Sequence, residues 1–124
     1  MIIRTNSQRV IITNKDLEKK FHTKEYEGIE FTFKNMTLKQ EMDMEAINQG
    51  MEDKGSTEQV KNLVTMVHKV LTENLVEVKG LVNENGDILS VSTELINDLI
   101  DYNYEFSFAV VMTYFSLKFK DKKK

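Results

Sequence analysis

The feature that most constrains the fold is a regular run of apolar residues in the middle of the chain. After Ser56-Thr57-Glu58-Gln59, a pattern that caps helix amino termini, apolar residues recur every three or four positions over about 20 residues. They are Val60, Leu63, Val64, Val67, Val70, Leu71, Leu75 and Val78. This spacing places them on one face of a helix, so we expect a long amphipathic helix that Gly80 terminates.

A second helix is predicted just before the first. Thr37-Leu38-Lys39-Gln40 is a capping-box pattern, in which the threonine hydroxyl accepts a first-turn amide and the glutamine reaches back to the backbone. We expect this helix to end between Gly50 and Gly55, the best loop candidate in the chain. Its expected apolar stripe consists of Leu38, Met42, Ala46 and Ile47.

The first 35 residues are less regular and richer in strand signals. Residues 2–5 and 9–13 are short β-branched runs that predict two strands, which could pair as a hairpin. Residues 30–34 alternate between apolar and polar side chains, as in a strand with one buried face. Phe31 and Phe33 are expected to point inward.

A hairpin and a third helix are predicted after Gly80. Residues 81–89 are expected to form a small β-hairpin closed around Asn85-Gly86, a pair that tolerates positive φ. Ser92 is expected to cap the next helix, because its hydroxyl can accept a free first-turn amide. The buried stripe of that helix would be Leu95, Ile96, Leu99 and Ile100.

The segment 104–119 is apolar almost all round. Its period fits a helix or a strand, and we favour a helix because the run is longer than an ordinary strand. As a helix it carries two apolar stripes, which need two neighbours. One stripe, with Phe106, Val110, Tyr114 and Leu117, is expected to be buried within the chain. We predict that the other binds a partner, through Phe108, Val111, Met112, Phe115 and Phe119.

The predicted fold is mainly α. It is a small helical bundle with a short N-terminal β element and a small β-hairpin near residues 81–89, or α+β if the N-terminal strands form a sheet. The 124 residues are expected to form a single domain, which can bury about two-thirds of the unfolded surface. Its parts are a strand-rich segment at 1–35, a helical part at 37–120 and a basic tail at 121–124.

Composition excludes several classes of protein. The 17 Lys and Arg against 20 Asp and Glu give a net charge of −3, which argues against binding to nucleic acid. No cysteine is present, so disulfides and thiolate metal sites are excluded. No apolar run reaches the length of a membrane-spanning helix, and the start of the chain lacks a signal-peptide pattern. We therefore expect a soluble chain without a membrane partner.

Catalytic and metal-binding patterns are not found. Residues 81–92 resemble the middle of a calcium-binding loop, but Leu81 and Ser92 fall at the first and twelfth positions, where carboxylates are needed. His22 and His68 do not form a paired metal-binding spacing. Neither a nucleophile elbow nor a glycine-rich phosphate loop is present. We predict a protein that is not an enzyme, with no catalytic residues, no metal site and no cofactor.

The order of the predicted elements resembles that of a known family. The resemblance rests on Phe31-Thr32-Phe33-Lys34, on Asn35-Met36-Thr37-Leu38 before a helix, on the long helix from Ser56, on the Asn85-Gly86-Asp87 turn and on two closing helices. In this layout, over roughly residues 30–120, the chain is similar to the tail assembly chaperones of long-tailed bacteriophages. The family has no invariant catalytic motif, so the resemblance concerns the order of the elements and the general character of their sequences.

The resemblance implies a function in phage assembly. Such chaperones are small, mostly helical proteins that are thought to bind the hydrophobic tape-measure protein and to help tail-tube subunits assemble around it. The expected partners are therefore the tape-measure protein and tail-tube subunits, with a homo-oligomer as a further state, and the expected location is the cytoplasm of the host bacterium. Two alternatives stay open: a structural virion protein of the tail or neck, and a small phage-encoded inhibitor of a host protein.

Overall fold

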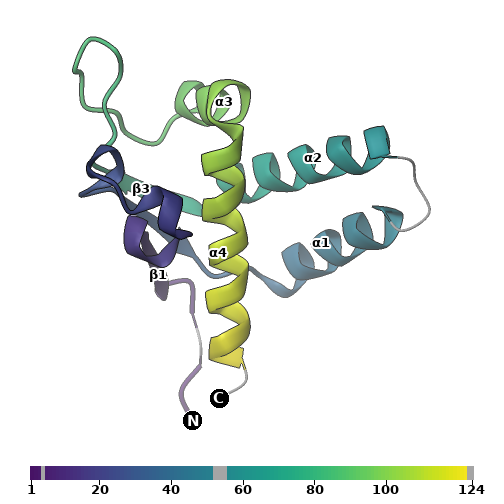
Figure 1. Ribbon diagram of the computed structural model, residues 1–124. Coiled ribbons are helices and arrows are strands. Elements are labelled where there is room, and N and C mark those ends of the chain that lie inside the picture. The colour runs from purple at the N-terminus through teal and green to yellow at the C-terminus, as the bar shows by residue number, and fades with distance from the viewer. Residues whose placement is uncertain (4, 52–55, 123–124) are drawn as a thin grey trace.

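The computed structural model describes residues 1–3, 5–51 and 56–122, and it shows an α+β fold dominated by helices (Figure 1). Four helices accompany a three-stranded antiparallel sheet. The sequence prediction of a helical domain with an added β element is confirmed, in its α+β form. In chain order the elements are β1 (Arg9–Thr13), η1 (Asn14–Asp16), η2 (Lys19–Phe21), η3 (Lys24–Tyr26), β2 (Glu30–Lys34), α1 (Leu38–Met51), α2 (Ser56–Asn74), β3 (Leu75–Lys79), α3 (Thr93–Tyr102) and α4 (Tyr104–Lys122), where η denotes a short 3-10 helix.

The sheet has the order β1-β2-β3, with β2 in the centre. Phe31 of β2 lies opposite Ile12 of β1 and opposite Val78 of β3, so that three apolar side chains line up across one face. The predicted hairpin between residues 2–5 and 9–13 is wrong. Residues 9–13 pair with β2 instead, because Glu30–Lys34 supplies a complementary row of buried aromatic side chains.

The third strand is the main feature that the sequence prediction missed. The long helix was expected to continue through Leu75 and Val78, but it ends at Asn74 and residues 75–79 pair with β2. A register irregularity between Thr32 and Phe33 allows Leu75 and Val78 to face the core although they are three positions apart. A spacing of three is also the spacing of a helix face, and this explains the error.

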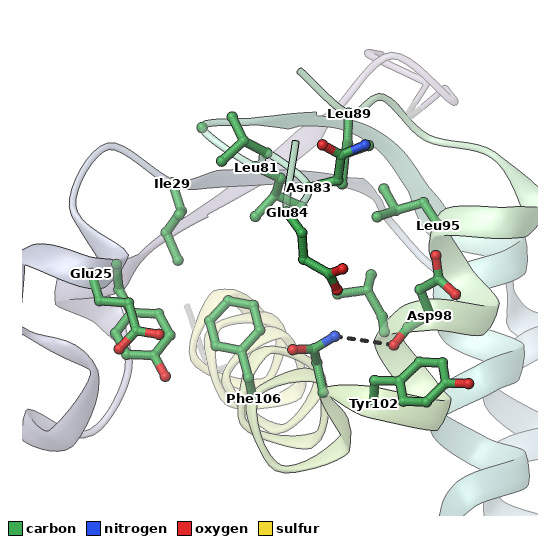
Figure 2. A pocket seen from close by; sticks show the side chains of 15 residues that line it. Glu25, Ile29, Leu81, Asn83, Glu84, Leu89, Leu95, Asp98, Tyr102 and Phe106 are labelled. Atoms are coloured by element: carbon green, nitrogen blue, oxygen red, sulfur yellow. Dashed lines mark hydrogen bonds between the residues drawn. The ribbon is translucent and has the colours of Figure 1, made fainter. Parts of the chain in front are cut away.

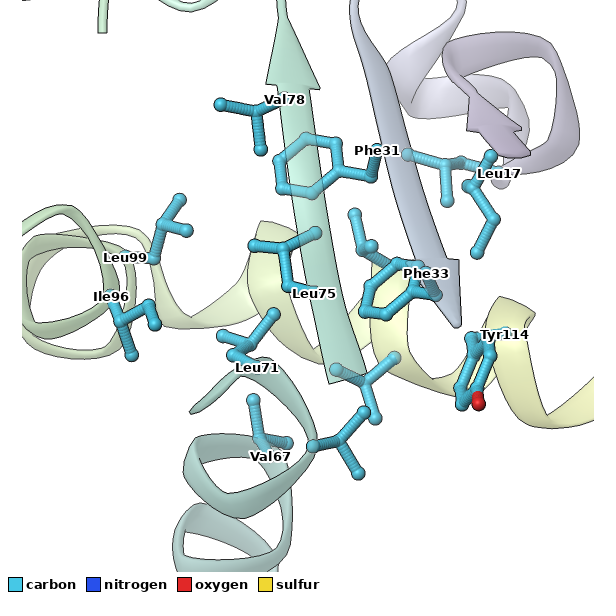
Figure 3. Close-up of a cluster of buried hydrophobic side chains, with 14 of the residues drawn as sticks. Leu17, Phe31, Phe33, Val67, Leu71, Leu75, Val78, Ile96, Leu99 and Tyr114 are labelled. Carbon is cyan, nitrogen blue, oxygen red and sulfur yellow. The ribbon is translucent and has the colours of Figure 1, made fainter. Parts of the chain in front are cut away.

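The core lies between the sheet and the helices (Figure 3). Phe31, Phe33 and Val78 point from the sheet toward Leu71 of α2 and Leu99 of α3. These side chains are all less than a tenth exposed, as are Met44 of α1 and Val111 of α4, so every helix contributes to one hydrophobic cluster.

Gly80 connects β3 to the segment that follows. Its backbone has φ of +79°, and a Cβ atom at this position would lie 2.5 Å from the carbonyl oxygen of Gly28. Both the positive φ and the close approach require glycine. The predicted helix stop at this position is thus the end of a strand, held against a neighbouring loop.

The predicted hairpin at residues 81–89 forms around a single bridge. Val82 and Ile88 are bridge partners, and the amide of Leu89 donates to the carbonyl of Leu81 at 2.9 Å. The Oδ1 atom of Asn83 accepts two backbone amides of the turn, from residues 85 and 87, at 2.9 and 3.0 Å. The turn is therefore organised by Asn83 as well as by the positive φ of Gly86.

The last two helices match their predictions. The hydroxyl of Ser92 accepts the amide of Leu95 at 3.1 Å and so caps α3. Of the two alternatives for residues 104–119, the helix is the correct one. Among the described residues, none of the helices is long and apolar enough to cross a bilayer.

Candidate partner-binding surfaces

Helix α4 is surrounded by other elements along most of its length. Among the side chains of residues 104–117, only Glu105 and Ser116 are exposed. Near its amino terminus, Phe106 stacks on Tyr26 with ring centroids 5.4 Å apart and meets Phe31 edge to face at 5.7 Å. The irregular segment between β1 and β2 thus covers the Phe106 side of α4, for which the sequence analysis expected burial but identified no neighbour.

The predicted partner-binding stripe of α4 is largely part of this packing. Val111 has no exposed surface and lies in the core, so the folded chain offers none of its side chain to a partner. Phe108, Met112 and Phe115 are half-buried and pack against the core cluster. The side chain of Phe119 lies outside the described part of the structure. Partner binding by the three half-buried residues stays a prediction.

Tyr114 anchors the other stripe of α4 to the sheet. Its ring stacks on Phe33 with centroids 4.7 Å apart, and its hydroxyl donates to the carbonyl oxygen of Lys34 at 2.8 Å. Burial raises the pKa of Tyr114 to about 12, because the charged phenolate would lose its hydration. This hydroxyl is a structural hydrogen-bond donor at the end of β2.

In helix α1, the residues predicted to be buried are mostly exposed. The stripe predicted to face the core is mostly on the outside: Leu38 is 74 % exposed, Met42 is 61 % exposed and Ala46 is exposed as well. Only Ile47 of that stripe is half-buried, and Met44, which the prediction left out, is in the core. The predicted orientation of this helix is therefore wrong by about half a turn.

The capping box explains the orientation of α1. As predicted, the side chain of Gln40 accepts the amide of Thr37 at 2.9 Å, and the hydroxyl of Thr37 accepts the amide of Gln40 at 3.1 Å. The same Gln40 oxygen also accepts the side-chain amide of the buried Asn74 at 3.1 Å. Gln40 is thereby fixed on the inner face, which puts Met44, one turn later, inside and Met42 outside.

The outer face of α1 is open in this fold. Helices α1 and α2 run side by side and extend away from α4 as an arm (Figure 1). Within the arm, Lys69 of α2 lies 3.7 Å from the carboxylate of Asp43 and 3.2 Å from that of Glu73. Because α2 covers one side of α1, Leu38, Met42 and Ala46 face away from it; we call these three residues the α1 outer stripe.

A pocket of about 580 Å³ lies at the other end of the molecule, between η3, the hairpin, α3 and the start of α4 (Figure 2). Its apolar lining includes Ile29, Leu95 and Leu99, each less than a tenth exposed, together with the half-buried Phe106. Tyr102 lies at the same pocket and is 82 % exposed. The pocket thus combines an apolar floor with an accessible aromatic side chain.

The charged groups of this pocket are all acidic. Glu25, Glu84 and Asp98 line it, and the lining includes neither Lys nor Arg nor His. None of the three carboxylates forms a hydrogen bond or ion pair within the residues that the structure describes. They come from three separate segments of the chain, so the sequence has no spacing that would have indicated them.

Neither of the two histidines lines the pocket or belongs to the α1 outer stripe. The Nε2 atom of His22 lies 2.8 Å from the carbonyl oxygen of Leu17, and His68 is an exposed residue of α2. In the described ranges of the chain, no three His, Asp or Glu side chains are placed to hold a metal ion.

The α1 outer stripe and the pocket lined by Glu25, Glu84 and Asp98, which we call the acidic pocket, are outward surfaces with apolar character in the described part of the structure. Both suit contacts with another polypeptide, because each joins apolar side chains to a polar rim. Comparisons with protein-family models, with curated proteins and with solved structures give no match to this chain.

Proposed function

We propose that this chain is a binding protein without catalytic activity, and that it acts as a phage tail assembly chaperone. In this role it binds the tape-measure protein in the host cytoplasm and keeps it available while tail-tube subunits assemble around it. The support from the sequence is the resemblance between the layout of the predicted elements and that of this chaperone family. The single observation that carries the proposal is the α1 outer stripe.

The stripe has the properties that a client helix requires. Leu38 and Met42 are one turn apart and expose most of their side chains. An amphipathic client helix can place its own apolar positions, spaced by three and four, along such a row. Methionine suits this use because its unbranched side chain adapts to different partners.

Exposure of this stripe also has a cost for an isolated chain. Large apolar side chains that stay in water forgo the stabilisation that burial would give, about 1.5 to 3 kcal/mol for each side chain. A partner that covers Leu38 and Met42 would recover part of that free energy. Client binding by the arm accounts for apolar residues that the fold itself leaves outside.

Co-expression with a fragment of the tape-measure protein tests the proposal. The wild-type chain should raise the soluble yield of the fragment, and the double variant Leu38→Ser with Met42→Ser should lose most of this effect. A matched control is Ile11→Ser with Ile88→Ser, because these two side chains are also exposed, at 52 % and 86 %, and neither lines the pocket. Circular dichroism should show folded protein for both variants. A fragment that stays insoluble with the wild-type chain would contradict the chaperone role.

A structural virion protein is the second candidate, and one observation favours it. Met1, Ile2 and Ile3 are exposed and precede β1, which is an edge strand of the sheet. Edge strands can pair with a strand of a neighbouring subunit. Mass spectrometry of purified virions distinguishes the two, because a chaperone should be absent from the particle and a structural component present.

A further inference from the structure

We propose that the acidic pocket binds a peptide segment of a partner protein in which an apolar side chain is flanked by lysine or arginine. This site is separate from the α1 outer stripe and does not depend on the chaperone role. It lies between the hairpin, α3 and the start of α4, whereas the stripe lies on the arm (Figure 1).

The pocket has room and chemistry for an apolar side chain. Its volume of about 580 Å³ lies within the range of sites that bind small ligands and side chains. The buried Leu95 and Leu99 and the half-buried Phe106 supply an apolar floor. A leucine or phenylalanine placed on this floor would bury its surface without rearrangement of the core.

The rim of the pocket selects for positive charge. Glu84 reaches over the floor from the hairpin, while Asp98 flanks it from α3 (Figure 2). Glu25 adds a third carboxylate from η3. The nearby Lys20 does not neutralise this set, because it pairs with Glu105, outside the pocket lining. Three carboxylates without a basic partner favour a cation and disfavour an acidic segment.

Tyr102 gives the pocket a second feature that suits cations. It follows Asp98 by one helical turn, so the two side chains lie on the same face of α3. A lysine or guanidinium group between them can pair with the carboxylate and contact the aromatic face. The high exposure of Tyr102 leaves its ring accessible to such a group.

The basic stretch of the same chain cannot fill its own pocket. Helix α4 starts beside the pocket and runs for 19 residues, which is about 28 Å of helix, to Lys122. The lysines at 118, 120 and 122 therefore lie toward the far end of α4 (Figure 1). The segment that enters the pocket is therefore not this part of α4, and we assign it to a different protein.

Binding of short peptides to the isotope-labelled chain, followed by NMR, tests the proposal. The probe is a capped peptide with the sequence Gly-Lys-Leu-Lys-Gly. In one comparison peptide glutamate replaces both lysines, and in the other serine replaces the leucine. The lysine-leucine peptide should shift the amide signals of Leu81, Asp98 and Tyr102, and high salt should weaken its binding about fivefold or more. The two comparison peptides should bind at least about fivefold more weakly.

A double variant provides the decisive comparison. Glu84→Gln with Asp98→Asn keeps the shapes of two exposed side chains and should weaken peptide binding about tenfold. Glu45→Gln with Glu58→Gln makes the same change of net charge on the arm and should leave binding unchanged. Both variants should keep the wild-type melting temperature within a few degrees.

Three results would overturn the proposal. The first is equal binding of the lysine and glutamate peptides. The second is unchanged binding in the pocket variant, or signal shifts confined to the arm. The third is self-association of the wild-type chain that the pocket variant abolishes, because the occupant would then be a second copy. Failure in any of these ways leaves the co-expression assay of the α1 outer stripe unaffected, so the two proposals fail independently.

Discussion

Helices α4 and α1 use their apolar residues in opposite ways. The sequence of α4 is apolar almost all round, and the structure buries or half-buries nearly all of its residues 104–117: Val110, Val111 and Tyr114 have no exposed surface. The sequence of α1 has one clear apolar stripe, and the structure leaves most of that stripe in water. The more hydrophobic helix is thus the less accessible one.

The difference comes from the neighbours that each helix has. Helix α4 contacts β1, α2 and α3, and its amino-terminal half also packs against the aromatic side chains of the segment before β2. Helix α1 packs mainly against α2. A partner surface is therefore indicated by an apolar stripe that lacks an intramolecular neighbour, and the hydrophobicity of a segment alone does not identify one.

The strongest test of this contrast places a charge on each helix. Val111→Lys should destabilise the fold by at least about 4 kcal/mol, because the ammonium group would lose its hydration in a fully buried position. Met42→Lys should change the free energy of unfolding by no more than about 0.5 kcal/mol, since the side chain stays in water and lysine is a good helix former. Urea denaturation followed by circular dichroism measures both.

The outcome of that pair is easy to interpret. A domain of this size is stable by about 5 to 15 kcal/mol, so the Val111 variant should lose a large share of its free energy of unfolding and should unfold at a much lower urea concentration than the Met42 variant. If the two variants are equally stable, α4 is not surrounded as described. In that case, the predicted partner stripe on α4 regains its place as the candidate surface.

The contrast also shows what the sequence could predict. Caps and periodicity predicted the starts of α3 and α1, because Ser92 and Thr37 act through atoms within one turn of their own position. The rotation of α1 could not be predicted in this way. It depends on Asn74, which is 34 residues from Gln40 and becomes its neighbour only when the chain folds.

The candidate sites depend still more on long-range packing. The pocket combines Glu25, Glu84 and Asp98 from separate elements, and the coverage of Phe106 depends on Tyr26 from the irregular first third of the chain. The third strand was missed because Leu75 and Val78 satisfy a helical spacing and are buried in either structure. Local patterns therefore predicted elements well and surfaces poorly.

Asn74 offers the next largest test, because its side chain connects α1 to the end of β2. Its side-chain amide lies within hydrogen-bond distance of the carbonyl oxygens of Lys34 and Asn35 and of Gln40 Oε1, at 3.3, 3.4 and 3.1 Å. Asn74→Asp should cost roughly 2 to 4 kcal/mol, because a carboxylate would face these oxygen acceptors in a buried position.

An exposed asparagine provides the control for that change. Asn97→Asp makes the same substitution on the exposed side of α3 and should alter stability by less than about 0.5 kcal/mol. Hydrogen exchange should show that the first turn of α1 loses protection in the Asn74 variant. Equal stability of the two variants would mean that Asn74 does not hold α1 in its orientation.

Tyr114 gives a smaller effect that depends on pH. Tyr114→Phe removes the hydrogen bond to Lys34 and should cost about 1 to 1.5 kcal/mol near neutral pH. Burial raises the pKa of Tyr114 to about 12 in the folded chain, against about 10 for an unfolded tyrosine. Because the folded pKa is the higher one, this contribution is fully present below about pH 10 and is lost as the pH rises toward about 12.

Unfolding curves at a series of alkaline pH values check this expectation. The difference in stability between the wild type and Tyr114→Phe should shrink steadily above about pH 10. Burial also raises the pKa of Tyr104, but this residue is present in both proteins and cancels in the difference. A difference that stays constant to pH 12 would show that Tyr114 ionises in the folded chain as easily as in the unfolded one.

The smallest of these effects concerns the cap that starts α1. Thr37→Ala removes the hydroxyl that accepts the amide of Gln40, and such a loss costs about 1 kcal/mol. Thr93→Ala is the matched control, because Ser92 already caps α3.

If the cap only starts the helix, the Gln40 side chain still holds Asn74, and Leu38 and Met42 keep their exposure and any client binding. If client binding is lost together with the cap, the orientation of the α1 outer stripe depends on the complete capping box. The stripe is then positioned by the two local hydrogen bonds between Thr37 and Gln40 as well as by the distant one from Asn74.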